Sequence, residues 1–505
     1  MMGARASPLA QVEQSRATCA ALRDLVGGAA GNIPALRAMA PACDVLCAAG
    51  MKRMTIKGDV LVPVVLGLLA VAAGGCTTEP EPAPATPPND EEALQASVEE
   101  SGAAIEAEVA ELEREQVAGD VYHYSFLLKV GNTPNARVRV HRVVREDAPW
   151  RARPASQAIM LLHGDFATFT TNFAPSRMST AAQPDHDLAA YLAERGIDVW
   201  GLDRRWTTAP EDGTDFSDFA DMGVEQAISD TGRALVFARS IRTLTGAGQD
   251  RMFLGGFSSG AQITYLYAAD ETQKKAEQRQ IKGIVPIDIY ATLSPEDADL
   301  KQLACDAAAQ ERDLVAKGEV DSDNSAFWQP LGELAVSAPS DPSPLFSGYT
   351  NRETLLGIMT QTYLIYAPKP KYHLVSGVFT NEAPTGLRYA PEALITDWLV
   401  NSPPHQALVE SADRDALWCG EAPLPIADHL ADIEVPLFYL GAAGGFGDHG
   451  LHTTTVVAST DVTTHVVRRL AVESEPEDFG HADLLYADDA PTLAWEPLSK
   501  WLLAH

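Results

Sequence analysis

Short apolar runs that alternate with helical stretches constrain the fold of this chain more than any other feature of its sequence. From residue 157 onward these runs are separated by stretches such as 187–195 and 226–244, in which apolar residues recur at helical spacing. Strands that helices cover on both faces read as continuous apolar runs, so the pattern predicts an α/β fold with a mostly parallel sheet flanked by helices. The predicted strands in this part are Gln157–Leu162, Ile197–Leu202, Met252–Gly255, Gly283–Ile287, Leu437–Leu440 and Thr463–Val467.

Two further features complete the predicted core. Residues 121–129 and 136–144 read as a hairpin of two strands, with Gly131 and Asn132 in the turn. The alternation then breaks between the predicted strands at 283–287 and 437–440. This interval is too long for a loop. We therefore expect a core of residues 120–294 and 431–505, with a large, mainly helical cap, 295–430, inserted before the strand 437–440.

The N-terminal part reads as an export signal. Residues 51–75 have a basic start, a short apolar run and small residues at the end, which is typical of a secretory signal peptide. The cysteine that follows, Cys76, completes a sequence (Ala73-Gly74-Gly75-Cys76) that resembles a bacterial lipoprotein signal, so we expect lipidation of Cys76. A plain signal peptide or an uncleaved anchor stays open as the alternative. Residues 1–50 precede this signal and are predicted to be an over-long start without structure.

The segment 76–119 is predicted to be a linker followed by a helix. Its first part is rich in Pro, Glu, Ala and Thr, a composition typical of a solvated tether. From 91 to 116 apolar residues recur roughly at helical spacing among acidic ones, which predicts an amphipathic helix that docks on its own domain.

Charge and cysteine content bear on partners and compartment. The 505 residues carry a formal charge of −31. Such an acidic surface repels phosphate backbones, so we expect no nucleic-acid partner. Apart from Cys76 and three cysteines within residues 1–50, only Cys305 and Cys419 remain. In an exported chain they are expected to form one disulfide, with two buried thiols as the alternative.

The motif that carries the chemistry is Gly256-Phe257-Ser258-Ser259-Gly260, which lies between a predicted strand and a predicted helix. A nucleophilic serine on such a sharp turn needs small neighbours, because a side chain at either flanking glycine would clash. We therefore predict that Ser258 is a nucleophile. The oxyanion would be stabilised by the backbone N–H of Ser259 and by that of Asp165, in the loop His163-Gly164-Asp165-Phe166 after an earlier strand, with Phe166 as the alternative donor.

The general base and its acidic partner are predicted from residues that follow later strands. His481, in Gly480-His481-Ala482, has the best position to take the Ser258 proton and return it. Asp448, after the strand 437–440, is the first candidate for the acid, and Asp288, at the end of the strand 283–287, is the alternative. Asp448, His449 and His452 also form a short cluster of metal-ligand types, but it lacks a third separate partner, and we expect no metal and no cofactor.

Taken together, His163-Gly164, the Ser258 turn and Gly480-His481 resemble the α/β-hydrolase superfamily over residues 120–294 and 431–505. The resemblance implies a serine hydrolase of the lipase or esterase kind, in which Ser258 forms an acyl-enzyme with a small-molecule or lipid ester. A peptidase or amidase of the same fold stays open, as does a surface lipoprotein that binds a ligand without turnover. With the signal at 51–76, the expected location is a bacterial cell envelope, with a membrane anchor at Cys76.

Overall fold

The computed structural model describes residues 90–183, 187–322, 324–361, 372–420 and 424–505. The predictions for residues 1–50, for the signal 51–75 and for Cys76 fall outside these residues. None of the helices in the described ranges is both long enough and apolar enough to cross a membrane.

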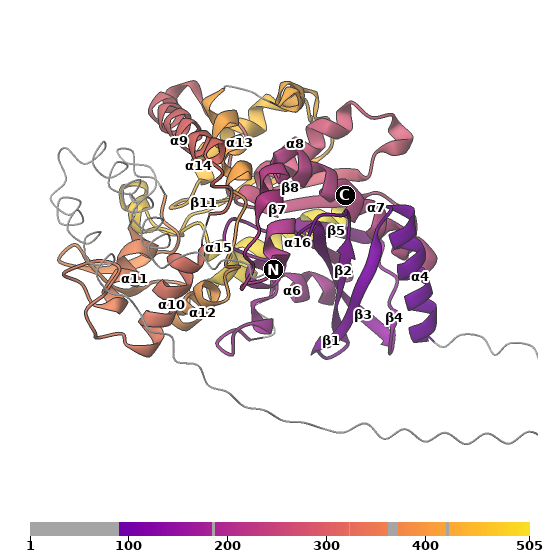
Figure 1. Ribbon diagram of the computed structural model, residues 1–505, viewed down its shortest axis with the longest axis horizontal. Helices are drawn as coiled ribbons and strands as arrows, with labels where there is room; N and C mark the ends of the chain where they lie inside the picture. Colours follow the sequence, from indigo (N-terminus) through magenta and orange to yellow (C-terminus); the bar gives the residue numbers. More distant parts are fainter. Residues whose placement is uncertain (1–89, 184–186, 323, 362–371, 421–423) are drawn as a thin grey trace, which may run out of the picture. The chain divides into compact units, whose positions relative to one another are not determined.

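A single mixed sheet organises this part of the chain (Figure 1). Its strands lie in the order β1-β2-β3-β6-β5-β7-β8-β11-β12, with the short β4 paired to β3. The strands from β6 to β12 are parallel to one another, whereas β1, β2 and β3 pair antiparallel, and β3 meets β6 antiparallel. The strands are β1 (Glu108–Ala118), β2 (Val121–Lys129), β3 (Arg137–Ala148), β4 (Arg151–Ala152), β5 (Gln157–Leu162), β6 (Ile197–Asp203), β7 (Met252–Phe257), β8 (Ile281–Ile287), β11 (Leu437–Ala442) and β12 (Val462–Val467).

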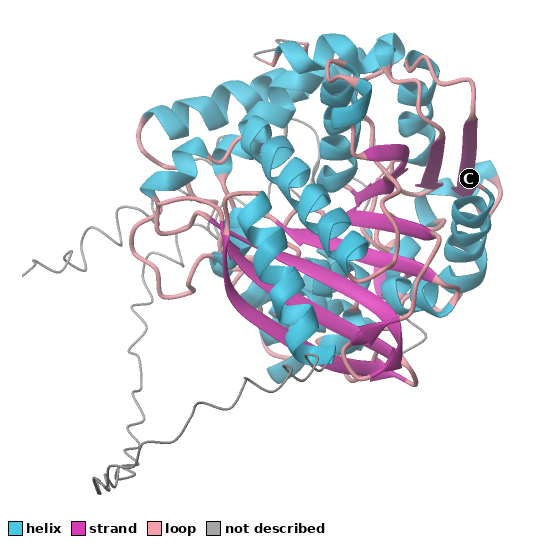
Figure 2. Ribbon diagram, turned by 90° about the vertical axis from the view of Figure 1, so that its right-hand side faces the viewer, coloured by secondary structure: helices cyan, strands magenta, loops and turns pink. Residues whose placement is uncertain are grey.

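Helices cover both faces of the sheet (Figure 2). Side chains of a strand point alternately to the two faces, and β5 shows this directly. Its Ile159 and Leu161 belong to one buried cluster and Met160 and Leu162 to the other. The first face packs against α6 (Leu188–Glu194) and α16 (Glu496–Ala504), and the second against α4 (Asp90–Ala104), α7 (Val224–Leu244) and α8 (Ser259–Thr272). The α/β prediction with a mostly parallel sheet is confirmed.

The prediction of one helix over 91–116 is wrong in its second half. The helix α4 ends at Ala104, and residues Glu108–Ala118 form the edge strand β1, which pairs with β2 along its length. Glu, Leu and Arg favour helices intrinsically, but pairing with the open edge of β2 overrides that preference. The helix α4 packs on α7, where Ser101 Oγ donates to Ser240 Oγ at 2.9 Å. The helix α4 and the strand β1 therefore both belong to the core.

The long insertion lies between β8 and β11. Its described part is mainly helical, and it also contains a small hairpin outside the main sheet. Residues 90–505 cluster as one compact unit, so the insertion is not a separate domain. Its elements are α9 (Ala298–Ala316), α10 (Trp328–Ser337), α11 (Asn351–Thr360), the hairpin β9 (Gly377–Thr380) and β10 (Ala383–Leu387), α12 (Glu392–Val400) and α13 (Leu408–Cys419).

The order of the strands determines where a site can form. The chain runs from β5 to β6 on one side of β5 and then to β7 on the other side. In such sheets ligands bind at the carboxyl ends of the strands, where the strand order reverses. The loops after β5, β7 and β8 therefore meet at one edge of the sheet.

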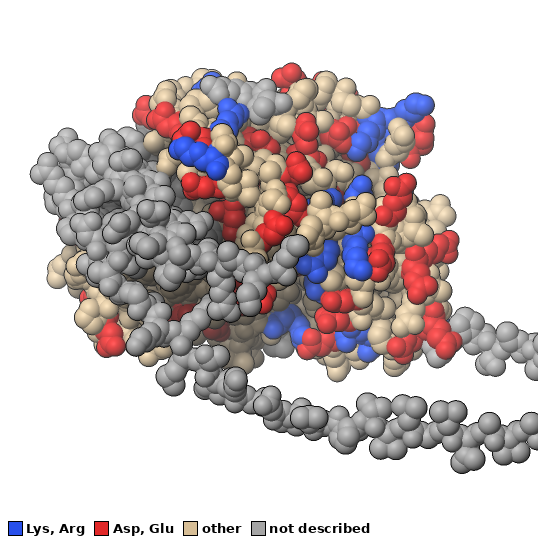
Figure 3. Space-filling model, in the orientation of Figure 1, with Lys and Arg blue, Asp and Glu red and all other residues tan. Residues whose placement is uncertain are grey.

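On the face of the molecule in Figure 3, acidic side chains are spread over the surface, and basic side chains lie among them.

Candidate active site

The Ser258 turn joins β7 to α8 in a strained backbone conformation. Ser258 has φ 54° and ψ −126°, a backbone conformation that residues other than glycine rarely adopt. The turn is held by the neighbouring strand, because the Ser258 N–H donates to the carbonyl of Ile287 at 3.0 Å. A strained serine between a buried strand and a buried helix is the geometry that exposes a nucleophilic hydroxyl.

The flanking glycines are required by close backbone contacts. A Cβ on Gly256 would lie 2.2 Å from the carbonyl oxygen of Gly260, and one on Gly260 would lie 2.3 Å from that of Leu162. Gly164, in the loop after β5, would bring a Cβ within 3.1 Å of the Ser258 Cβ. Small residues therefore let the loop after β5 approach the nucleophile, as the sequence predicted.

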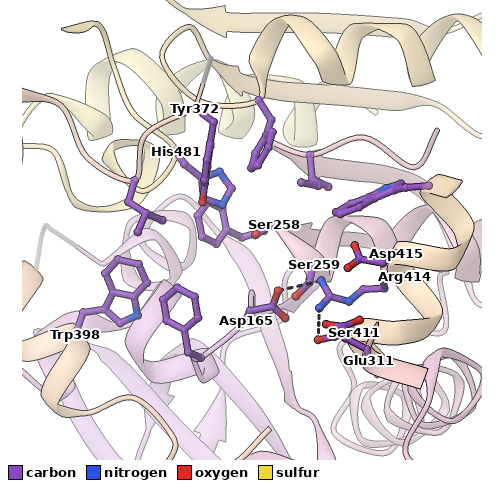
Figure 4. Close-up of a pocket in the computed structure, with 16 residues that line it drawn as sticks. Asp165, Ser258, Ser259, Glu311, Tyr372, Trp398, Ser411, Arg414, Asp415 and His481 are labelled. Carbon is purple, nitrogen blue, oxygen red and sulfur yellow. Dashed lines mark hydrogen bonds and ion pairs between the residues drawn. The ribbon is translucent and has the colours of Figure 1, made fainter. Parts of the chain in front are cut away.

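His481 is oriented by Asp288. The His481 Nδ1 lies 2.7 Å from the Asp288 Oδ2, and both side chains are buried. The backbone N–H groups of Ala442 and Phe446 also donate to the Asp288 carboxylate, at 2.8 and 3.1 Å. A His481 ring that donates from Nδ1 to this carboxylate keeps Nε2 as an acceptor. Figure 4 shows His481 and Ser258 in the same cavity.

Asp448 does not contact His481, so the prediction of Asp448 as the acid is wrong, and the alternative, Asp288, lies in that position. Its carboxylate lies on the surface, where it pairs with Arg468 at 3.3 Å and is 45% exposed. Both candidates follow a strand, but Asp288 directly follows β8, which lies next to β7, the strand that Ser258 follows. The insertion therefore follows the acidic residue in the chain, whereas the sequence analysis predicted that the insertion precedes it.

The insertion holds the His481 loop in place. The N–H groups of His481 and Ala482 donate to the carbonyls of His373 and Leu374 at 3.0 and 2.7 Å. A buried carboxylate, Asp483, accepts from the N–H groups of Gly480 and Ser376 at 2.7 and 2.8 Å. Burial raises the pKa of Asp483 to about 7. Sequence reasoning missed the contacts between the insertion and the His481 loop because they join segments more than a hundred residues apart.

The loop after β5 presents the predicted oxyanion donors. The N–H of Phe166 donates to Gln406 Oε1 at 2.9 Å, so it is already occupied. Within the described ranges the N–H groups of Asp165 and Ser259 have no acceptor, which favours this pair over Phe166. The Asp165 side chain turns away to Gln406 Nε2 and Arg414, at 2.8 and 2.9 Å. Burial alone would raise the pKa of Asp165, but Arg414 and Arg204 outweigh it and lower the pKa.

A buried network behind the loop supports it. Arg204, directly after β6, donates to the carbonyls of His163 and Gly164 at 2.9 and 2.8 Å and to Ser259 Oγ at 3.2 Å, and it pairs with Glu410. Burial, with Arg204 next in effect, lowers the pKa of His163 to about 3, so this ring is neutral and serves the loop rather than proton transfer. The one sequence signal that could have pointed to this network is the position of Arg204 shortly after the predicted strand Ile197–Leu202.

These residues surround one cavity of about 210 Å³ (Figure 4). It is lined by Ser258, His481, Asp165 and Ser259, together with aromatic and charged side chains from the insertion.

The predicted disulfide is confirmed, because Cys305 on α9 is bonded to Cys419 on α13. These two helices form one wall of the cavity. Among the described residues no group of three or more His, Cys, Asp or Glu side chains is arranged to hold a metal ion.

Comparisons with known proteins show the fold. No protein-family model matches the chain, and no curated protein matches its sequence. Among solved structures, a candidate lipase from Sulfolobus solfataricus matches at 16% identity, over 78% of this chain and 99% of its own, with a TM-score of 0.52. A monoglyceride lipase from Saccharomyces cerevisiae matches at 11% identity over 79% and 96% of the two chains, with a TM-score of 0.39. An epoxide hydrolase from Vigna radiata matches at 13% identity over 78% and 98%, with a TM-score of 0.38.

At such low identity the likeness to the Sulfolobus protein is a likeness of fold alone. The mostly parallel sheet of this chain and the helices on both of its faces are consistent with that fold. The described part of this chain has the α/β-hydrolase fold.

Proposed function

We propose that this protein is a serine hydrolase that cleaves a carboxylic ester through an acyl-enzyme on Ser258. The observation that carries the proposal is the strained Ser258 turn in one cavity with His481, whose Nδ1 bonds the buried Asp288. A turn that costs backbone strain persists only where the surrounding structure holds it, and such strain clusters at functional sites.

Each group has a defined task in this mechanism. His481 Nε2 takes the proton of the Ser258 hydroxyl as its oxygen attacks the ester carbonyl, and Asp288 stabilises the imidazolium that forms. The N–H groups of Ser259 and Asp165 donate to the oxyanion of the tetrahedral intermediate. His481 then protonates the leaving alcohol. A water molecule, deprotonated by the same nitrogen, attacks the acyl-enzyme, and His481 returns this proton to Ser258 Oγ as the acid leaves.

Labelling of the full chain with a fluorophosphonate probe tests this proposal without a guess at the substrate. We expect the adduct on Ser258, and we expect His481→Ala to abolish it. The matched variant His429→Ala, at a partly exposed position in the 3₁₀ segment Pro425–Asp432 that does not line the cavity, should keep the adduct. Ser258→Ala should lower ester turnover on the order of 10⁴-fold or more. A folded protein that forms no adduct would overturn the assignment and favour a binding protein without turnover.

The labelling experiment does not show whether the enzyme cleaves an ester or an amide bond, so this question needs a second measurement. A peptidase or amidase of this fold would use the same Ser258 and His481. Because a serine peptidase also cleaves activated esters, turnover of an anilide with the same acyl group is the result that distinguishes the two, and we expect cleavage of the ester without measurable cleavage of the anilide.

We also propose that the chain is exported and anchored through lipid on Cys76. The support is the signal sequence at 51–76 together with the Cys305–Cys419 disulfide, because disulfides persist in oxidising compartments. Expression in bacteria with radiolabelled palmitate should label the protein, and Cys76→Ser should remove the label. Label that remains in this variant would contradict the anchor at Cys76.

A further inference from the structure

The cavity that contains Ser258 has two chemically different ends. On one side lie Trp398, Phe166 and Leu374, and Phe166 stacks on Trp328 and Trp398 with ring centroids 4.2 and 5.4 Å apart. The other end is formed by α9 and α13, with Glu311, Ser411, Arg414 and Asp415. Figure 4 shows Trp398 and Asp415 on opposite sides of Ser258. A substrate bound at Ser258 therefore places one part against aromatic rings and another against charged groups.

The positive charges at this end are already neutralised. Arg414 pairs with Asp165 at 2.9 Å and donates its second amino group to Ser411 at 3.1 Å. Behind it, Arg204 pairs with Glu410. Neither guanidinium is therefore left to recognise an anionic substrate group.

Two carboxyl groups are left over. Glu311 and Asp415 both line the cavity, and among the described residues neither forms an ion pair or a hydrogen bond. The Glu311 Oε2 is shielded from solvent and has no donor. A buried carboxylate oxygen without a partner costs on the order of 1–3 kcal/mol, so its presence beside a nucleophile points to a ligand whose positive charge offsets the lost hydration of this oxygen.

The titration of both groups agrees with this geometry. Burial, with the charge of the neighbouring Asp415 next, raises the pKa of Glu311 to about 8. Burial likewise raises the pKa of Asp415 to about 6, against the opposing effect of Arg414. A cation bound between the two carboxylates would offset both the lost hydration and their mutual repulsion.

We infer that the α9–α13 end of the cavity, through Glu311 and Asp415, binds a cationic group of the substrate, so that the preferred ester joins an apolar part to a positively charged part. The inference rests on the proposed function, because Ser258 defines which bond lies between the two ends. The Cys305–Cys419 disulfide joins the two helices that carry these carboxylates and keeps them at a fixed separation.

Matched esters that differ only in charge test the inference. For the alcohol side we compare choline butyrate with its carbon isostere 3,3-dimethylbutyl butyrate. For the acyl side we compare the p-nitrophenyl esters of 4-(trimethylammonio)butyrate and of 5,5-dimethylhexanoate. Measured at pH 8, one cationic ester should have a kcat/KM at least about tenfold above its isostere, as expected for a charge pair in a partly desolvated site.

The variants assign that preference to the two carboxylates. The double variant Glu311→Gln, Asp415→Asn should reduce the ratio of cationic to neutral ester about tenfold, and each single variant should reduce it less. Asp306→Asn, which removes an exposed carboxylate from the same helix α9, should leave the ratio unchanged. Fluorophosphonate labelling of Ser258 and the thermal midpoint show that each variant is folded.

Two results would overturn the inference. One is a wild-type protein that prefers neither cationic ester, or that prefers an ester with a carboxylate, such as a hemisuccinate, over its neutral isostere. The other is a preference that survives in the double variant. Binding of the same ester pairs to Ser258→Ala, measured by calorimetry, gives the ratio without turnover. A protein that labels at Ser258 but shows no preference contradicts this inference alone, whereas one that binds the cation but does not label contradicts the proposed function alone.

Discussion

Replacement of Asp288 by asparagine is the sharpest test of how His481 is held. In the structure the Asp288 Oδ2 accepts from His481 Nδ1 and from the Phe446 N–H, and Oδ1 accepts from Ala442. An asparagine has one oxygen for these donors. If that oxygen keeps Ala442, the amide NH₂ faces His481 Nδ1, which must then accept, and the ring proton moves to Nε2.

A His481 ring with its proton on Nε2 cannot take the proton of Ser258. Loss of the correct tautomer in a serine hydrolase costs about 10⁴-fold in kcat, which corresponds to about 5.5 kcal/mol at 1.36 kcal/mol per factor of ten. The Phe446 N–H also loses its acceptor, so the free energy of unfolding should fall by about 1–3 kcal/mol. Activity should therefore fall far more than stability.

The assay compares Asp288→Asn with Asp448→Asn. We measure kcat with p-nitrophenyl butyrate, the rate of fluorophosphonate labelling, and urea unfolding at the same pH. Asp448 makes a half-exposed ion pair with Arg468, and such pairs contribute little, so its variant should keep kcat within about twofold. A folded Asp288→Asn protein whose kcat stays within tenfold of the wild type would refute the assigned geometry, as would a collapse of activity in Asp448→Asn.

Three further predictions follow from packing, titration and covalent structure. Gly260→Ala should destabilise the protein by about 3 kcal/mol because its Cβ meets a backbone oxygen, whereas Gly357→Ala, in an open helical position, should be neutral or stabilising in the same thermal unfolding assay. Burial raises the pKa of Asp483 from 3.8 to about 7, so its contribution to stability is complete below pH 4 and is lost as the pH rises to 7. Asp483→Asn should therefore gain stability relative to the wild type over that range, by about 4 kcal/mol at its end, and a difference between the two that does not change with pH would contradict this. The double variant Cys305→Ser, Cys419→Ser opens a link across 114 residues and should lose about 2–5 kcal/mol in urea unfolding, while an unchanged midpoint would show that the bond does not constrain the unfolded chain.

Local features of this protein were readable from its sequence. The turn at Ser258 was predicted because a strand, two glycines and a helix follow one another within a few residues, and the close contacts of Gly256 and Gly260 are made to that same turn and to the adjacent strand. The buried parallel strands were predicted for a similar reason, since an apolar run covered on both faces carries its own signal.

Features that depend on which segments meet in space were decided by the tertiary structure. Asp288 and Asp448 both follow a strand, and only the position of β8 beside β7 brings one of them to His481. Residues 108–118 favour a helix by composition but pair with the open edge of β2. Glu311 and Asp415 look like ordinary surface acids on amphipathic helices, and only the packing of α9 against α13 over Ser258 buries them in the cavity. The physical reason is the same in each case: strand, turn and helix signals arise within a segment, whereas hydrogen-bond partners and burial depend on which other segments pack against it, from the next strand in β1 to a loop 193 residues away in Asp288.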